Sequence, residues 1–331
     1  MPTVSVITTF HNAAETLSES INSVMSQQFA DFEYLLVDDG SDDSSAELVR
    51  GYDDNRIRLL QPGRVGRAAA LNLALQHACG DYIAILDADD ICLQDRLSLQ
   101  ASMLANNGAL TLVCSNVELV DQRGRKTGMT RFPVAHEALF KSLTELNPFP
   151  HSSVMFRREA AIQIGGYNLR CEKSIDFNFY LDLLAAGGKF LGYGQALIRL
   201  RSYPGSWGKN DKQALQMRYG ILGLVNYYQR QRGDGGILHV DEAQWNVVKQ
   251  NFDHWFDHQG YQQRLQAKQI FSGIRQQFRQ FRFFQAARQL PQLFRLDPWF
   301  WRYRGCGFVY PQDVTNFLHQ LDVLTVSGER F

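Results

Sequence analysis

Cysteine is scarce in this sequence. The 331 residues include five cysteines, no two of which form a C-x-x-C pair, at positions 79, 92, 114, 171 and 306. An odd number of scattered cysteines is typical neither of a zinc knuckle nor of the disulfide framework of a small secreted protein. The sequence therefore favours a reducing compartment, and we expect a cytoplasmic protein.

Long apolar runs and an excess of one charge are also missing. No run approaches the roughly 20 apolar residues that a membrane-spanning helix needs. The first ten residues, MPTVSVITTF, lack the basic start and apolar core of a signal peptide. Lys and Arg together number 34, as do Asp and Glu, so the net charge is zero and general nucleic-acid binding is not expected.

The first half of the chain alternates short apolar runs with helical patterns. The runs predict strands at 4–9, 34–37, 57–60 and 82–86, and helices are expected after Asn12, from Ser44 or Ser45, at 66–78 up to a stop at Gly80, and around 97–104. Such alternation predicts an α/β domain with a parallel sheet. Further strands at 110–120, 152–156 and 190–201, with a helix around 179–184, predict a mixed sheet and a domain of residues 1–205. Residues 206–331 are expected to form a mostly helical region.

Polar clusters follow three of the predicted strands. They are TTFHN at 8–12, DDGS at 38–41 and DADD at 87–90. Ligands of such sheets bind outside the carboxyl ends of the strands, so we expect the three clusters to line one crevice. Each cluster also has a purely structural interpretation, as turn and helix-cap residues. Asn12, for example, is expected to cap a helix, with Glu15 three residues later in the capping-box position.

Asp87 and Asp89 are candidate ligands of a divalent cation. Side chains alternate along an extended segment, so both carboxylates would project to the same side. Mg²⁺ and Mn²⁺ prefer oxygen ligands and are commonly shared between carboxylates and substrate phosphates. The alternative is a solvated acidic loop that starts a helix, with Asp90 as its N-cap. For Asp38 and Asp39 the alternatives are hydrogen bonds to a base or ribose, or a turn and cap role.

Three ordered stretches carry a family resemblance: VSVITTFHNAAETLSESINSVMSQQFADFEYLLVDDGSDDSS, GRAAALNLALQHACGDYIAILDADDI and PHSSVMFRREAAIQIGGY. Over roughly residues 2–205 they resemble family 2 glycosyltransferases with the Rossmann-like GT-A fold. The resemblance implies inverting transfer of a sugar from a nucleotide diphosphate-sugar, UDP-linked, with Mg²⁺ or Mn²⁺. It implies as acceptor a glycan or lipid-linked hydroxyl, in cell-surface polysaccharide or lipopolysaccharide biosynthesis.

The same resemblance assigns roles to individual positions. It implies that Asp38 or Asp39 contacts the base and that Asp87 and Asp89 handle the ribose and the metal–diphosphate. The residues that it places along the donor nucleotide are Thr9, Phe10, Asn12 and Glu15.

Inversion by direct displacement needs a base beside the acceptor hydroxyl. Many relatives carry Glu-Asp followed by x-Asp at the start of a helix after a GGY segment, and the corresponding stretch here is KSIDFN at 173–178. Asp176 falls on the position of the usual base, whereas Ile175 and Asn178 replace the other acids. Glu172 is a possible substitute, and a plain helix cap is the alternative for Asp176.

Two further side chains are weaker candidates. Arg67 is expected either to steady a phosphate or to lie solvated at a helix start. His151 is expected either to face the acceptor or to pack inside a turn.

Residues 264–304 are rich in Arg and aromatics. This segment holds nine basic residues and one acid, Asp297. Basic faces beside aromatic ones suit an anionic membrane surface, so we expect a peripheral position on the inner face of the plasma membrane. The alternative is an amphipathic helix packed on the catalytic domain.

The sequence also allows three other functions to be considered. A D-x-D phosphohydrolase usually has its motif near the N-terminus, unlike this chain. A receiver domain with an acidic pocket would be a shorter chain. A sugar-nucleotide-binding protein without catalysis would account for the thinned acidic motif around Asp176.

Overall fold

A computed structural model describes residues 1–93, 95–143, 149–201, 210–233 and 235–258, together with the single residues 263, 270, 289, 291, 292, 295, 315 and 317. The chain forms two compact units, Met1–Ser206 and Trp207–Phe331, which are described separately.

The first unit is built on one mixed, mainly parallel sheet, which confirms the predicted α/β class. Four parallel strands form one half, in the spatial order β3 (Ile57–Leu60), β2 (Phe32–Asp38), β1 (Val4–Phe10) and β4 (Tyr82–Ile85). Antiparallel β8 (Met155–Arg157) joins them to β6 (Leu110–Val120), β9 (Lys189–Arg201) and β5 (Ile91–Cys92), while β7 (Lys126–Met129) pairs with β6. The carboxyl ends of β1, β2 and β4 therefore meet at one edge.

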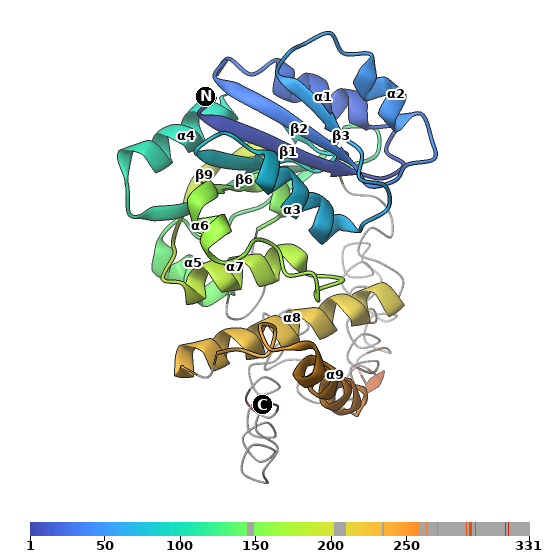
Figure 1. Ribbon diagram of the computed structural model, residues 1–331, viewed down its shortest axis with the longest axis vertical. Coiled ribbons are helices and arrows are strands. Elements are labelled where there is room, and N and C mark those ends of the chain that lie inside the picture. The colour runs from blue at the N-terminus through green and yellow to red at the C-terminus, as the bar shows by residue number, and fades with distance from the viewer. Residues whose placement is uncertain are drawn as a thin grey trace. The chain divides into compact units, whose positions relative to one another are not determined.

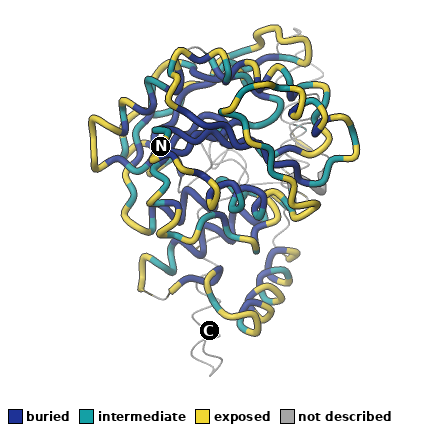
Figure 2. The backbone as a smooth tube through the Cα atoms, turned by 45° about the horizontal axis from the view of Figure 1, so that its top comes forward, coloured by how far each residue is buried: buried dark blue, intermediate teal, exposed yellow. Residues whose placement is uncertain are grey.

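Helices cover both faces of this sheet. Alternate side chains of β1 and β2, among them Val6 and Leu36, share a core with α1 (Leu17–Met25), α2 (Ser45–Arg50) and α4 (Arg96–Asn106). On the other face α3 (Arg67–His77) contacts β1 and β2. Strands buried on both faces lie at the centre of the unit in Figure 2. Burial on both faces explains why these strands read as unbroken apolar runs.

The second half of this unit adds further helices, with α5 (His136–Leu143), α6 (Arg158–Gln163) and α7 (Ile175–Ala185) near one another in Figure 1. The 3₁₀ helix η1 (His151–Ser153) precedes β8, and α6 follows it. Helix α5 contacts β9 and α7. The predicted strand at 152–156 is thus wrong over its first half. Strand β5 was not predicted, because two residues carry too little pattern.

Asn12 and Gly80, which were expected to start and to end helices, have other roles in the structure. Helix α1 begins at Leu17 after Thr16, so the prediction that Asn12 caps it with Glu15 is wrong. Asn12 has a φ of 54° and donates from its side chain to Asp42 at 2.5 Å. Gly80 does not end α3 through a left-handed turn. A Cβ at Gly80 would lie 2.6 Å from the backbone nitrogen of Ser5, so close approach of the chain to β1 demands glycine there.

The second unit contains two long helices among its described residues, α8 (Asn210–Arg232) and α9 (Glu242–Asp257). Asp241 and Gln244 form a capping box at the start of α9. Arg218 of α8 binds Asp253 and Asp257 of α9, each at 2.7 Å. Within the described part of the chain, no helix is both long and apolar enough to cross a bilayer. The predicted basic segment at 264–304 lies outside the described residues, apart from a few single positions.

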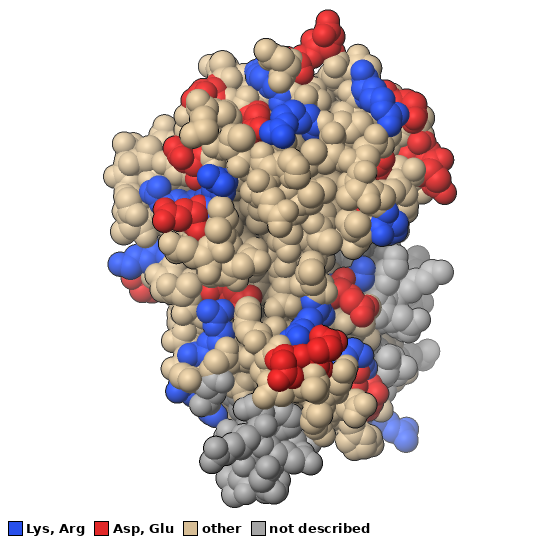
Figure 3. All heavy atoms as spheres, viewed as in Figure 1, with Lys and Arg blue, Asp and Glu red and all other residues tan. Residues whose placement is uncertain are grey.

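Charged side chains of both signs are interspersed on the face drawn in Figure 3. Many form ion pairs at the surface, such as Arg50 with Glu47 at 3.0 Å, both exposed, and Arg56 with Asp54 at 2.8 Å, both half-buried. Such pairs typically contribute about 0–1 kcal/mol each, so they hold surface loops rather than the fold.

Candidate active site

Two adjoining hollows open where β1, β2 and β4 end, as the strand-end clusters predict. They share Thr9, Phe10, His11 and Arg67. The first has a volume of about 630 Å³ and is lined further by residues 12–16, Asp43, Asp87, Ala88 and Asp89. The second has a volume of about 560 Å³ and is lined further by Asp39, residues 64–66, Ala68, Ala69, Leu169, residues 171–173 and Ile175. The structure thus brings together residues from all three clusters.

The acidic residues after β4 form a tight turn. The amide of Asp90 donates to the carbonyl of Asp87 at 3.0 Å, so the segment is not extended and the predicted alternation is wrong. Ser152 holds this turn from η1. Its Oγ accepts the amide of Asp87 at 3.0 Å, and its hydroxyl donates to Asp90 Oδ2 at 2.5 Å. A turn, rather than a pleat, therefore places Asp87 and Asp89 on the same hollow.

This turn concentrates negative charge in a partly buried place. Burial, followed by the charge of Asp87, raises the pKa of Asp89 above its usual value. Burial, followed by Asp87 and Asp89, raises the pKa of Asp90 much further. Asp90 is 3% exposed and leads into β5, so its predicted role as the N-cap of a helix is wrong. A cation bound at the turn would relieve this repulsion.

Arg67 is the side chain that joins the two hollows. It is the first residue of α3, and its Nη2 donates to Asp87 Oδ1 at 2.6 Å. The carboxylate of Asp87 is the main reason why the pKa of Arg67 is raised. Its side chain remains 45% exposed, so the guanidinium can still meet an anion in either hollow.

His151 lies behind Arg67 and is 5% exposed. Its Nδ1 lies 3.3 Å from Nη2 of Arg67, and its Nε2 lies 2.9 Å from the hydroxyl of Tyr167. Burial, followed by the charge of Arg67, lowers the pKa of His151 well below its usual value. The prediction that His151 faces the acceptor is wrong, because its ring is enclosed by protein.

Asp38 and Asp39, after β2, are bound mainly by the loop that follows β3. Asp38 accepts the amide of Ser41 at 2.8 Å and the side chain of Gln61 at 3.0 Å. Oδ1 of Asp39 accepts two amides at 2.8 Å each, and Oδ2 accepts Arg64 at 2.9 Å. Only Asp39 of the pair lines a hollow, so of the two it is the one placed to contact a ligand.

The loop after β1 forms one wall of the larger hollow. All four predicted donor-binding residues of this loop line it, namely Thr9, Phe10, Asn12 and Glu15. The loop is pinned to the loop after β2, because the amide of Ala13 donates to Ser45 at 2.9 Å and that of Ala14 to Asp43 at 3.1 Å. Two strand-end loops thus act as one rigid wall.

Asp176 is the second residue of α7. The N-cap position belongs to Ser174, so Asp176 lies in the first turn of this helix rather than at its N-cap. The side chain is half-buried, and its charge is a lesser cause of the raised pKa of Arg67 and of Tyr167. Glu172 is exposed and lines the smaller hollow. Both acids are therefore on the α7 side of the crevice.

The described residues hold no cluster of three or more His, Cys, Asp or Glu that could bind a metal by themselves. Asp87 and Asp89 are two oxygen ligands at one hollow, and Mg²⁺ commonly takes one or two carboxylates with the rest from water and phosphates. The donor set therefore fits a cation that is completed by substrate.

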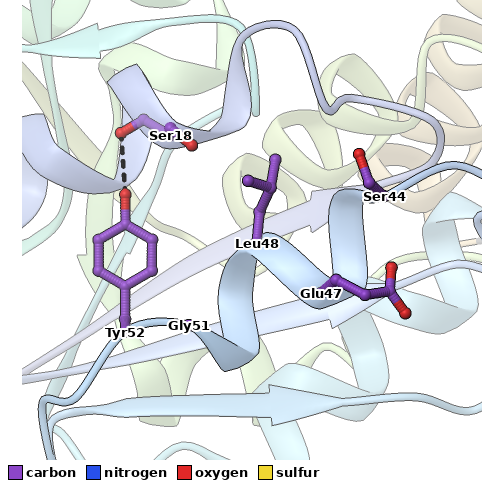
Figure 4. Close-up of a pocket in the computed structure, with 6 residues that line it drawn as sticks. All are labelled: Ser18, Ser44, Glu47, Leu48, Gly51 and Tyr52. Atoms are coloured by element: carbon purple, nitrogen blue, oxygen red, sulfur yellow. Dashed lines mark hydrogen bonds between the residues drawn. The ribbon is translucent and has the colours of Figure 1, made fainter.

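A third hollow lies between α1 and α2 and is shown in Figure 4. There the hydroxyl of Tyr52 donates to the carbonyl of Ser18 at 3.3 Å. Leu48 and Glu47 form the rest of its lining together with Ser44 and Gly51. Among the described residues that line it, Glu47 is the one carboxylic acid, none is an arginine, lysine or histidine, and none belongs to the strand-end clusters.

Several residues of the site were not predicted from the sequence. Ser152 and Tyr167 lie in the stretch PHSSVMFRREAAIQIGGY but had no predicted role, and their contacts with Asp90 and His151 are what place them at the site. Arg201 does stand at a strand end. Its amide donates to Asp90 Oδ1 at 3.0 Å, and its guanidinium donates to the carbonyl of Asp89 at 3.2 Å and to Glu19. The strand-end position of Arg201 was the one available signal.

Comparison with known proteins agrees with this site. Residues 5–165 match the family described as Glycosyl transferase family 2. The chain is 32% identical over 237 residues to EpsE of Bacillus subtilis, a protein named as a glycosyltransferase, and the match covers 69% of this chain and 81% of EpsE. This chain belongs to glycosyl transferase family 2, as its motifs predict, and is a glycosyltransferase.

A second relative has a more specific name. WfgD of Escherichia coli is a UDP-Glc:alpha-D-GlcNAc-diphosphoundecaprenol beta-1,3-glucosyltransferase, 40% identical over 119 residues that cover 36% of this chain and 47% of WfgD. Among solved structures, S. aureus TarS 1–349 matches with a TM-score of 0.54 at 18% identity, over 76% of this chain and 80% of TarS. The same protein is known in complex with UDP-GlcNAc. The structural match confirms the GT-A fold.

Proposed function

We propose that this enzyme transfers a sugar, with inversion, from a UDP-sugar to a hydroxyl of a glycan or lipid-linked acceptor in the synthesis of a cell-surface polysaccharide. This proposal rests on the acidic turn beside Arg67, where β1, β2 and β4 end. The UDP-linked donor is supported by the substrate of WfgD and by the ligand of TarS. The lipid-linked acceptor is supported by the name of WfgD.

Asp87 and Asp89 would hold Mg²⁺ or Mn²⁺ together with the donor diphosphate. Bound there, the metal would neutralise charge on the departing nucleoside diphosphate. Arg67 would add a guanidinium on the same side, since it lines both hollows. Asp39, held by the amides of Val65 and Gly66, would face the nucleotide from the smaller hollow.

Asp176 would take the proton from the acceptor hydroxyl. It lies on the α7 side, and Glu172 is the one acid of the neighbouring loop that lines a hollow. Asp176→Asn keeps the size and removes the proton acceptor. We expect donor affinity to persist and turnover to fall by about 10² to 10⁴, the usual contribution of a general base.

The test is sugar transfer measured beside calorimetric titration of UDP, with Glu172→Gln as the matched control. Near-normal turnover of Asp176→Asn together with inactive Glu172→Gln would move the base to Glu172. Donor binding without transfer to any acceptor, in the unmodified chain, would instead favour a sugar-nucleotide-binding protein without catalysis.

The donor itself can be found by thermal stabilisation. A ligand that binds only the folded state raises its stability. We expect one UDP-sugar of a panel to stabilise the chain in the presence of Mn²⁺. Stabilisation by no nucleotide-sugar, with or without metal, would contradict the proposed function.

We further propose that the basic segment at 264–304 contacts anionic lipid. The support is that this segment holds nine basic residues and one acid. Replacing Arg275, Arg279 and Arg282 by Glu in the full chain should reduce flotation with anionic vesicles. The same charge change at Arg123, Arg125 and Lys126, in and beside the β6–β7 turn, should leave it intact. Equal flotation of both variants would contradict the proposal.

A further inference from the structure

A relay of three side chains runs inward from the acidic turn. Nη2 of Arg67 carries two hydrogens, and it lies 2.6 Å from Asp87 Oδ1 and 3.3 Å from Nδ1 of His151. Nε2 of the same histidine lies 2.9 Å from the hydroxyl of Tyr167. The exposed end of the relay is in the site, and the inner end is fully buried.

The donors and acceptors of this relay fix the histidine tautomer. A guanidinium has only donors, so Nδ1 of His151 must accept and carries no proton. Its hydrogen is then on Nε2, which donates to Tyr167. A doubly protonated ring would point an N–H at Arg67, and burial beside this cation disfavours that form.

Tyr167, the inner end of the relay, is anchored to α3, the helix whose first residue is Arg67. The amide of Tyr167 donates to Asn72 of α3 at 2.8 Å, and the carbonyl of Tyr167 accepts from the same side chain at 2.8 Å. The ring of Tyr167 also stacks on Phe179, with centroids 4.3 Å apart. Gly166 permits this approach, because a Cβ there would lie 2.4 Å from Asn72 Oδ1. Arg67 and Tyr167 are thus clamped to one rigid body.

We infer that His151 is a positioning residue for donor binding: in its Nε2–H tautomer, set by the donor-only guanidinium of Arg67 and bound by the hydroxyl of Tyr167, it holds that guanidinium beside Asp87 and open toward the diphosphate. This role rests on the proposed function, since it acts through Arg67 on a nucleotide. Tyr167 acts one step further from the ligand. Neither side chain would touch the nucleotide, because both are buried.

The histidine can be replaced in two matched ways. The carbonyl oxygen of Asn reaches the position of Nδ1, whereas the amide of Gln reaches the position of Nε2. His151→Gln therefore loses the acceptor for Arg67, and we expect it to weaken UDP binding with Mn²⁺ by about tenfold, the range for a hydrogen bond to a charged group. His151→Asn keeps an acceptor and should stay closer to the unmodified chain.

The tyrosines offer a stricter pair. Tyr167→Phe removes the acceptor of the Nε2–H and so frees the His151 ring, and it should therefore also weaken UDP binding. Tyr180→Phe is the control. Tyr180 is equally buried and meets the His151 ring with centroids 6.2 Å apart, but its hydroxyl has no hydrogen-bond partner among the described residues. Equal affinities of the two Phe variants would overturn the inference.

A double-mutant cycle separates positioning from general damage. If His151 and Tyr167 act through Arg67, then Tyr167→Phe should have no further effect on UDP affinity once Arg67 is replaced by Ala. Additive losses would show a structural role and overturn the inference.

The tautomer itself can be observed without any ligand. In ¹⁵N-histidine-labelled chain, with the signal assigned by its loss in His151→Gln, we expect Nδ1 of His151 to be unprotonated and Nε2 protonated. The opposite tautomer would overturn the inference whatever the chain binds. Failure of the unmodified chain to bind UDP, with the expected tautomer present, would instead count against UDP as the donor nucleotide.

Discussion

Two acidic clusters stand at neighbouring strand ends and look alike in the sequence, but their surroundings differ. After β2, the carboxylates of Asp38 and Asp39 accept five hydrogen bonds from their own and the following loop. After β4, Asp87, Asp89 and Asp90 crowd into one turn. There burial and mutual repulsion raise the pKa of Asp89 and Asp90.

The difference separates a structural use of carboxylates from a chemical one. A carboxylate that accepts several N–H bonds is satisfied and rigidifies its loop. Carboxylates that repel one another at the edge of a hollow are destabilising until a cation or a proton arrives. The cluster after β2 therefore shapes the site, and the cluster after β4 is the one prepared to bind.

The largest effect is expected at Asp89. Asp89→Ala should lower the metal-dependent affinity for UDP by about 100-fold or more, because a metal contact is worth several kcal/mol and each 1.4 kcal/mol is tenfold. The fold should persist or gain stability, since a repelling charge is removed. Calorimetry with and without Mn²⁺ measures this change. Unaltered metal dependence would place the cation elsewhere.

The opposite pattern is expected at Asp39. Asp39→Ala leaves the amides of Val65 and Gly66 and the side chain of Arg64 without their acceptor. We expect the free energy of unfolding to fall by about 3 kcal/mol, since two loop amides and a guanidinium lose hydrogen bonds to a charged acceptor, each worth about 1.5–3 kcal/mol when well formed. Denaturant titration measures it, with Asp89→Ala as the control. A smaller loss than at Asp89 would erase the distinction between the two clusters.

The repulsion in the acidic turn should also make the free energy of unfolding depend on pH. The pKa of Asp90 is raised in the folded state, so the folded chain binds this proton more tightly than the unfolded chain. Its favourable contribution is complete below the unfolded pKa near 4 and is lost as the pH rises through the folded pKa, at about 1.4 kcal/mol per unit.

Asp90→Asn should remove this loss. Relative to the variant, the unmodified chain should therefore become less stable as the pH rises above about 4 toward the raised pKa of Asp90 in the folded state. Unfolding by urea at several pH values measures the difference. A difference that is constant with pH would show that Asp90 is not a strained acid.

The smallest effect is expected at Asn12, which ties the β1 loop to the β2 loop. Asn12→Ala should cost about 1 kcal/mol, because Asn12 has a left-handed backbone that alanine adopts poorly. Asn12→Gly relieves this strain but also lacks the bond to Asp42. If both variants lose the same stability in thermal unfolding, the bond rather than the backbone matters.

Much of the frame follows from local pattern. Strands β1, β2, β3, β4, β6 and β9 and helices α2, α3, α4 and α7 lie where apolar runs and helical spacing predict them. The pattern fails where an element is short or is decided by distant contacts. Strand β5 has two residues, and the 152–156 run divides because η1 must reach the acidic turn with Ser152.

The sequence by itself determined that acids, an arginine and polar loops follow consecutive parallel strands, because strand order and strand ends are encoded locally. It could not separate Asp39 from Asp89, since both are acids after an apolar run. Only the tertiary structure decided their difference, by the number of N–H groups that reach each carboxylate. It also decided the place of His151, because Tyr167 and Arg67 are 100 residues apart in the chain and meet that ring only after α3 and the segment before α7 have packed together.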